Sequence, residues 1–236
     1  MSNRFSQINS GNYRIVNCDD NAHLVGTLLR YLSSALGPVI EDSRRQIPSP
    51  AFSTFFGDVN FGPHVSGLLL NVTTGVAMDD QGSPILFCTT GINQLPIIDQ
   101  DTGVHTDMYL HCQETEGMIM TIWYDTPYIV ICPFFFTTPN LQAVPPGHNR
   151  PKVARNMMEY LGTGASVVQY QMWSIFNQIV HYYVFMAHRE QTSSIDNINA
   201  CMRLEGNDSV LNPQSYLYYA ASKCVLREPK VRFWPC

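Results

Sequence analysis

Residues 169–190, QYQMWSIFNQIVHYYVFMAHRE, form the longest apolar stretch of the chain that neither proline nor glycine interrupts. Its apolar residues recur at close to helical spacing and cover nearly every side of the predicted helix. A helix that is apolar on almost all sides is a buried one. The stretch also holds two histidines, His181 and His188, among aromatic side chains. We therefore expect a central buried helix that carries the functional site, with the rest of the chain packed around it.

The bulk composition narrows the class of protein. With 236 residues, the chain is long enough for a single domain, 1–236, with a real core. Charged residues make up only 14%, the net charge is −5 and no basic run occurs, so nucleic acid is not an expected partner. No uninterrupted apolar run reaches the ~18 residues of a membrane span, so none is expected. The sequence carries no signal for the oligomeric state.

Seven cysteines are spread from end to end without a CxxC pair, which argues against a zinc ribbon and favours disulfides between remote segments. Two N-glycosylation sequons begin at Asn71 and Asn207. Together these features favour a secreted protein or one of the secretory pathway. The chain opens on polar residues with no signal peptide, so we expect a mature form with an added Met1. A cytosolic protein with buried thiols is the alternative. An odd number of cysteines leaves at least one thiol outside an intramolecular pair.

Local patterns place helices before and after a group of strands. Residues 19–21 offer an N-cap for the first helix. Residues 91–107 and 137–151 are rich in glycine, proline and polar residues and are expected to be loops. The predicted order is helices, then a few strands, then helices, which indicates an α+β fold, mostly helical with a small sheet. Expected helices cover 22–41, 51–56, 63–78, the region from 153 through the central stretch, 195–204 and 213–222, and expected strands cover 85–88, 118–123 and 128–132.

Three phrases of the sequence carry a resemblance to a known family. They are SPAFSTFF at 49–56, PYIVICPFFF at 127–136 and NPQSYLYYA at 212–220. In order and spacing they resemble the fungal secreted deuterolysin-like, or aspzincin-like, putative peptidases, and the resemblance covers most of the chain. It implies a zincin-like single domain linked by disulfides.

The resemblance also implies a zinc site, which this chain departs from. In that family a His-Glu-x-x-His helix supplies two zinc ligands and the general base, and a later Asp supplies a third ligand. In the matching register His181 takes the first ligand position, but Tyr182 replaces the Glu and Phe185 replaces the second His. Asp196 falls near the third position. His188 lies two turns beyond His181, about 10.5 Å along the axis, too far to share its zinc. We therefore expect no metal and no other cofactor.

A cleft that exchanges charged ligands for aromatic side chains becomes an apolar pocket with a few polar groups, which is typical of a small-molecule site. We expect it to bind a hydrophobic small molecule. The candidate catalytic residues are Tyr182, His181 and Arg232. The further candidates for ligand contacts are Phe185, His188, Tyr216, Tyr219, Trp173 and Arg227.

Each candidate also has a structural interpretation. His181 can be a core histidine hydrogen-bonded within the fold, and Tyr182 and Phe185 can be core aromatics. His188 suits a helix C-terminus, and the two arginines suit the surface. His64, His105, His111 and His148 are scattered and lack ligand spacing, so we expect them at the surface.

Three functions remain. The first is a metal-independent pericyclase of secondary-metabolite biosynthesis, similar to the fungal hetero-Diels–Alderases, in which apolar partners are held in reactive geometry and a donor polarises one of them. The second is a secreted interaction protein, an effector or antigen, on an inactive peptidase fold. The third is a zinc metallo-endopeptidase with an unusual site.

Overall fold

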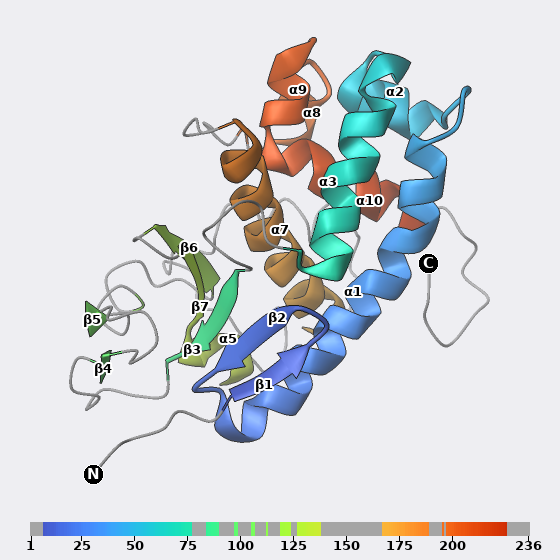
Figure 1. Cartoon of the computed structure of the whole chain (residues 1–236). Coiled ribbons are helices and arrows are strands. Elements are labelled where there is room, and N and C mark those ends of the chain that lie inside the picture. The colour runs from blue at the N-terminus through green and yellow to red at the C-terminus, as the bar shows by residue number, and fades with distance from the viewer. Residues whose placement is uncertain are drawn as a thin grey trace.

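The computed structural model describes residues 7–76, 84–89, 97–98, 105–106, 112, 119–123, 127–137, 167–188, 195 and 197–225. Over these ranges the protein is mostly helical, with a small sheet beside a layer of helices (Figure 1). The predicted α+β class with a small sheet is confirmed. A zincin-like fold stays a prediction.

Apart from the short helix α5, the described helices form two groups that are in contact with each other. Helices α1, α3 and α7 pack on one another, and α1 and α7 also contact the sheet. Helices α2, α8 and α9 gather around α10, at the end of the molecule away from the sheet (Figure 1). The helices are α1 (Ala22–Ser43), α2 (Pro50–Phe56), α3 (Gly62–Thr74), α5 (Pro133–Thr137), α7 (Val167–His188), α8 (Ile198–Cys201), α9 (Asn207–Leu211) and α10 (Pro213–Val225).

The main sheet in the described part of the chain has five strands in the order β1-β2-β3-β7-β6. Antiparallel pairs lie at its two edges, β1 with β2 and β7 with β6. Strand β3 lies between them and is parallel to both β2 and β7. The strands are β1 (Gln7–Ser10), β2 (Tyr13–Val16), β3 (Ile85–Cys88), β6 (Ile119–Trp123) and β7 (Pro127–Ile131).

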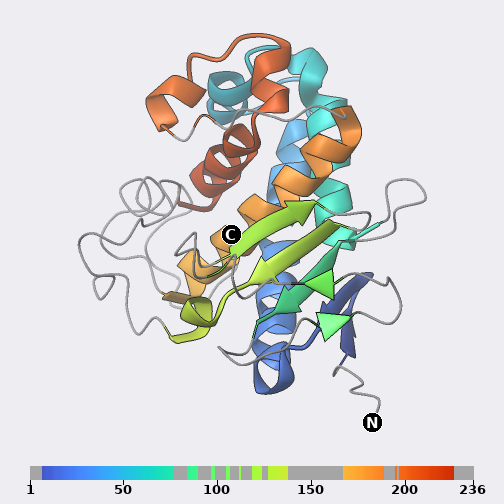
Figure 2. The same cartoon turned by 90° about the vertical axis from the view of Figure 1, so that its left-hand side faces the viewer.

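The central strands bury side chains on both faces of the sheet. Leu86 and Ile129 belong to the core shared with the helices, whereas their neighbours Phe87 and Val130 form a second buried cluster. Side chains alternate between the faces of a strand, so the two clusters lie on opposite faces. Figure 2 looks onto the face turned away from these helices, with α1 and α7 behind the strands. Burial on both faces explains why β3 and β7 read as continuous apolar runs.

Helix α1 follows from its apolar stripe, and it extends two residues beyond the predicted end at Glu41. The N-terminal cap differs from the prediction. Residues Asp19–Asn21 form a 3₁₀ turn, and the Asn21 side chain makes no capping hydrogen bond. The buried stripe of α1, rather than its cap, therefore defines this helix.

Helix α3 begins with Pro63 in its first turn, as predicted, but ends at Thr74 instead of near Met78. The reason is Gly75, whose φ of +65° is left-handed and whose backbone N–H donates to the Asn71 carbonyl oxygen at 2.8 Å. Glycine adopts this conformation without steric cost and commonly ends helices. The apolar pattern continued past the residue that stops the helix.

Aromatic side chains hold α2 against α10. The rings of Phe52 and Phe56 each lie 5.5 Å from the ring of Tyr219, nearly perpendicular to it. Phe56 also contacts Tyr216, with the ring centroids 5.1 Å apart. Edge-to-face pairs of this kind add about 0.5–1.5 kcal/mol each beyond area burial. The phrases SPAFSTFF and NPQSYLYYA thus form one aromatic contact surface.

Two disulfides connect segments remote in the sequence, as expected from the scattered cysteines. Cys18 is bonded to Cys88, next to the paired strands β2 and β3, and Cys112 is bonded to Cys132 at the end of β7. Cys224 is disulfide-bonded as well. Cys201 is a buried thiol that donates to the Ile195 carbonyl oxygen at 2.9 Å.

Several predictions of element order were wrong. The chain does not start with a helix, because the β1–β2 hairpin precedes α1. The expected loop 91–107 contains a two-stranded pair, β4 (Ile97–Ile98) and β5 (His105–Thr106). Helix α9 was not predicted. The proline-rich loop beyond Thr137, the helix expected from 153 to 166 and the C-terminal tail lie outside the described residues.

Candidate functional site

One face of α7 carries polar side chains in an otherwise apolar core. His181 follows Asn177 by four residues and His188 follows it by eleven. At 3.6 residues per turn these spacings place all three side chains on the same side of the helix. Both neighbours of His181, Val180 and Tyr182, are fully buried. This polar stripe is therefore the feature of α7 that core packing does not explain.

His181 is partly buried and lies opposite α10. Its Nε2 atom is 3.4 Å from the side-chain nitrogen of Gln214. In the assigned orientation of the Gln214 amide that nitrogen can only donate, so His181 Nε2 accepts and the proton lies on Nδ1. Burial lowers the pKa of His181 to about 4. The imidazole is consequently neutral at physiological pH and presents one N–H donor.

Asn177 lies one turn before His181 and is buried. Its side-chain oxygen Oδ1 has no hydrogen-bond partner in the described structure. A buried acceptor without a partner costs about 1–3 kcal/mol, so such groups are uncommon unless something else satisfies them. A ligand hydroxyl or amide can do so.

Phe185 lies one turn after His181 and is partly buried, packed at the margin of the core. Together with Asn177 and His181 it gives α7 an acceptor, a neutral donor and an apolar surface in succession. This is the combination that orients an apolar ligand with one polar group.

Four further predicted site residues, all aromatic, lie in the core. The exposed fraction is zero for Tyr182, Tyr216 and Tyr219 and 2% for Trp173. The ring of Tyr182 packs edge-on against Tyr183 at 4.8 Å. For Tyr182 this placement matches the structural interpretation as a core aromatic, and Trp173, Tyr216 and Tyr219 fill the core as well. Arg227 and Arg232 lie outside the described residues.

Two of these tyrosines use their hydroxyl groups within the fold. Tyr216 donates to the Val210 carbonyl oxygen at 3.0 Å, and Tyr219 lies 2.8 Å from Asp42 Oδ2. Burial raises the pKa of both phenols, and for Tyr219 the adjacent carboxylate raises it further. Both hydroxyls are thus protonated and serve as structural donors.

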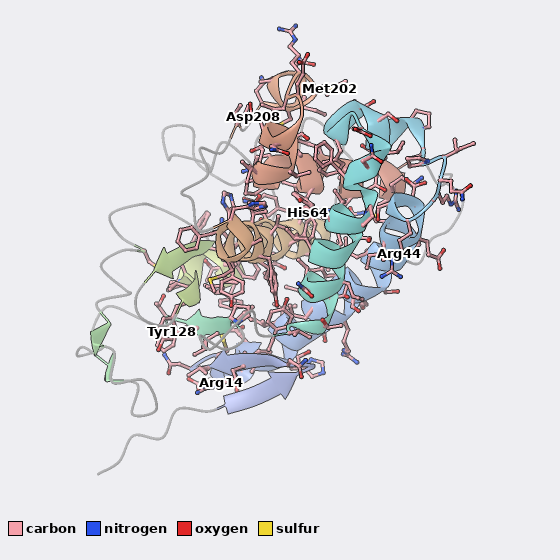
Figure 3. The ribbon with its side chains drawn as sticks, turned by 45° about the horizontal axis from the view of Figure 1, so that its top comes forward. Arg14, Arg44, His64, Tyr128, Met202 and Asp208 are labelled. Carbon is pink, nitrogen blue, oxygen red and sulfur yellow. A yellow bond between two sulfur atoms is a disulfide. The ribbon has the colours of Figure 1, made fainter. Side chains whose placement is uncertain are left out.

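His188 ends α7, where its position in the last turn agrees with the expected helix C-terminus. His64, in the first turn of α3 (Figure 3), lies beside it, with the ring centroids of the two histidines 5.3 Å apart. The prediction that His64 is a surface residue was wrong, since it is only partly accessible and its Nε2 atom is buried. Burial, and then the charge of His188, lower the pKa of His64. No sequence spacing links the two residues, so only the fold reveals this pair.

Across the described segments, no group of three or more His, Cys, Asp or Glu side chains is arranged to hold a metal ion. The described residues therefore supply no set of three zinc ligands of the kind that the resemblance to a zinc peptidase implies.

The two sequons lie in different settings. Asn207 is exposed at the start of α9, near Asp208 at the end of the molecule that Figure 3 shows uppermost. Asn71 is partly buried within α3. Accessibility favours Asn207 as the acceptor, and glycosylation of both remains a prediction.

Comparison with known proteins gives no family. No protein-family model, no curated protein and no solved structure matches the chain. In addition, none of the helices in the described ranges combines the length and apolar character needed to cross a membrane.

Proposed function

We propose that the part of the polar stripe of α7 formed by Asn177 and His181 binds a hydrophobic small molecule that carries one carbonyl or hydroxyl group. The observation that supports this most directly is His181, which remains partly accessible although burial lowers its pKa to about 4. Asn177 supplies a buried acceptor without a partner, and Phe185 supplies apolar surface beside it. A neutral, desolvated site of this kind disfavours charged ligands.

The proposal extends to a metal-independent hetero-Diels–Alder reaction in a secreted protein. An o-quinone methide and an alkene combine in one step that forms a C–C and a C–O bond, with no leaving group and no proton transferred overall. The site contributes by holding the two partners together. The Nδ1–H of His181 donates to the quinone methide oxygen and stabilises the negative charge that grows there in the transition state.

The test compares His181→Leu and His181→Gln with the exposed histidine variant His23→Gln. An o-quinone methide generated in solution and an apolar alkene are the substrates, and formation of the cycloadduct is measured. Loss of the donor should slow the reaction by about 100-fold in His181→Leu, whereas His181→Gln retains an N–H and recovers part of the rate. His23→Gln should match the wild type.

The pH profile provides a second readout. An exposed histidine titrates near pH 6.5, but His181 with a pKa of about 4 stays neutral throughout the neutral range. We expect a rate that does not change between about pH 6 and 8. A wild-type protein that neither accelerates the reaction nor binds either substrate refutes the proposal.

A second candidate function is a secreted interaction protein. It is favoured by the full burial of Tyr182, Tyr216 and Tyr219, which fill with core packing the region where the resemblance expects a cleft. Two further variants separate the two functions. In an interaction protein Tyr182→Phe and Phe185→Ala change only stability, whereas in a ligand-binding protein Phe185→Ala weakens binding of the apolar substrate at unchanged fold.

A further inference from the structure

The pair formed by His64 and His188 has no role in the proposed small-molecule site. The two rings come from different helices, α3 and α7, and their centroids are 5.3 Å apart with the planes inclined by 49°. His188 lies two turns beyond His181, so the pair occupies a separate position at the end of α7. Figure 3 shows His64 on α3 beside this end of α7.

Both rings leave the same atom without a partner. The Nε2 atoms of His64 and of His188 are buried, and neither has a hydrogen-bond partner in the described structure. Leaving one buried polar atom unsatisfied costs about 1–3 kcal/mol. Here two adjacent imidazoles each have an unsatisfied nitrogen. A single group bound between the rings could satisfy both nitrogen atoms at once.

The spacing of the rings fits such a group. A metal ion lies about 2.0–2.1 Å from each coordinating imidazole nitrogen. With a tetrahedral angle at the metal, the centroids of two coordinating rings are then about 5 Å apart. The observed separation of 5.3 Å agrees with this value.

We propose that His64 and His188 bind a divalent transition-metal ion through their Nε2 atoms, joining α3 to α7. Neutral imidazole is a ligand for Cu²⁺, Ni²⁺ and Zn²⁺, and Cu²⁺ binds most tightly of the three. No third His, Cys, Asp or Glu from the described segments completes the site. The remaining coordination positions are open to water or to an external ligand. The arrangement differs from a His-Glu-x-x-His site, in which one helix supplies both histidines.

The alternative is a pair of imidazoles that are merely in contact, with their planes tilted. Such a pair needs no ion, and substituting either ring would change stability alone. Metal coordination instead requires both rings at once, so each single variant should abolish the bound ion rather than halve it.

The experiment titrates the full-length, disulfide-bonded protein, without a histidine tag, with Cu²⁺ and separately with Zn²⁺. The variants are His64→Asn and His188→Asn, and His23→Asn on the exposed face of α1 is the matched control. Calorimetry measures stoichiometry and affinity. Electron paramagnetic resonance of the Cu²⁺ form counts the coordinated nitrogen atoms from their hyperfine splitting.

We expect one Cu²⁺ per wild-type chain, coupled to two imidazole nitrogens, and a melting temperature that rises with added metal. Each site variant should lose at least about 100-fold in affinity, more than is lost when a residue that only supports a metal ligand is substituted. His23→Asn should bind like the wild type. A wild-type chain without stoichiometric binding, or with Cu²⁺ binding that survives both variants, overturns the proposal. Because the wild type alone can refute it, a variant that fails to fold does not prevent a decision.

Discussion

Substituting Asp42 by Asn tests the buried polar network that joins α1, α2 and α10. The Asp42 side chain has 1% exposure. It accepts from Ser49 Oγ at 2.6 Å, from the Tyr219 hydroxyl at 2.8 Å and from Lys223 Nζ at 3.1 Å. The end of α1, the N-cap of α2 and the sequence-remote helix α10 thus meet at one carboxylate.

The expected loss follows from these contacts. Each hydrogen bond to a charged group contributes about 1.5–3 kcal/mol, but Asn keeps one acceptor oxygen. It also turns an N–H₂ group toward donors and leaves Lys223 without its anion. Removing one partner of a buried ion pair costs about 3–5 kcal/mol. We expect a loss of about 4 kcal/mol at pH 7, equivalent to about 8–16 °C in melting temperature for a domain of this size.

The pH dependence gives a second test of the same contacts. Burial acts to raise the pKa of Asp42, but the hydrogen bonds from Ser49, Tyr219 and Lys223 outweigh it, so the pKa is lowered. A group with a lowered folded-state pKa stabilises the protein above its unfolded pKa, about 3.9 for Asp, and loses that contribution as the pH falls through the folded-state value. The difference between wild type and Asp42→Asn should therefore be largest at neutral pH and shrink below about pH 4.

Urea unfolding followed by tryptophan fluorescence, at several pH values between 3 and 8, measures both effects. The exposed aspartate variant Asp20→Asn is the control, and it should change the free energy of unfolding by less than about 0.5 kcal/mol. A loss below about 1 kcal/mol for Asp42→Asn at pH 7, or a loss that persists unchanged to pH 3, would refute the assigned role of this carboxylate.

Two further predictions concern covalent and backbone constraints. Replacing Cys18 and Cys88 by Ser opens a link with a sequence separation of 70, for which loop entropy predicts a loss of about 4 kcal/mol in equilibrium unfolding; an unchanged midpoint would contradict this. Gly75→Ala should cost more than about 1 kcal/mol, because φ is +65° and the new Cβ would lie 2.9 Å from the Tyr13 ring. Gly67→Ala, inside the same helix with no atom within 4 Å of the new Cβ, should instead stabilise by about 0.5–1 kcal/mol; equal effects would refute the role of Gly75.

Helices and strands with a strong local pattern were predictable. The apolar stripe of α1 and the continuous apolar run of β3 specify their elements without reference to the rest of the chain. The β1–β2 hairpin was not predictable. Strand β1 is a short polar edge strand, and the apolar pattern of its partner β2 is weak. The hairpin is stabilised by β3, which pairs with its strand β2. Strand β3 lies about 70 residues further along the chain, so only the fold shows this pairing.

The candidate site was predictable in part. Histidines within an apolar helix directed attention to His181 and His188, and the helix itself is confirmed. Local spacing did not indicate which neighbours face inward, and Tyr182 proves fully buried. The proximity of His64 to His188 depends on how α3 packs against α7, which no local pattern encodes. Likewise, seven cysteines allow many pairings, and only the fold selects Cys18 with Cys88.

The parallel pairing of β2 with β3 also sets an order of events during synthesis. Val16 leaves the ribosome well before its partner Phe87, and at about 5–20 residues per second the wait is roughly 4–14 seconds. Helix formation takes about a microsecond, so α1 can form long before the central strand exists. The N-terminal hairpin must wait with an unpaired edge, and the bond between Cys18 and Cys88 can form only once the sheet strand that carries Cys88 has been made. A chaperone or an early oxidant that reaches Cys18 first would therefore act on a chain whose sheet has not yet begun to assemble.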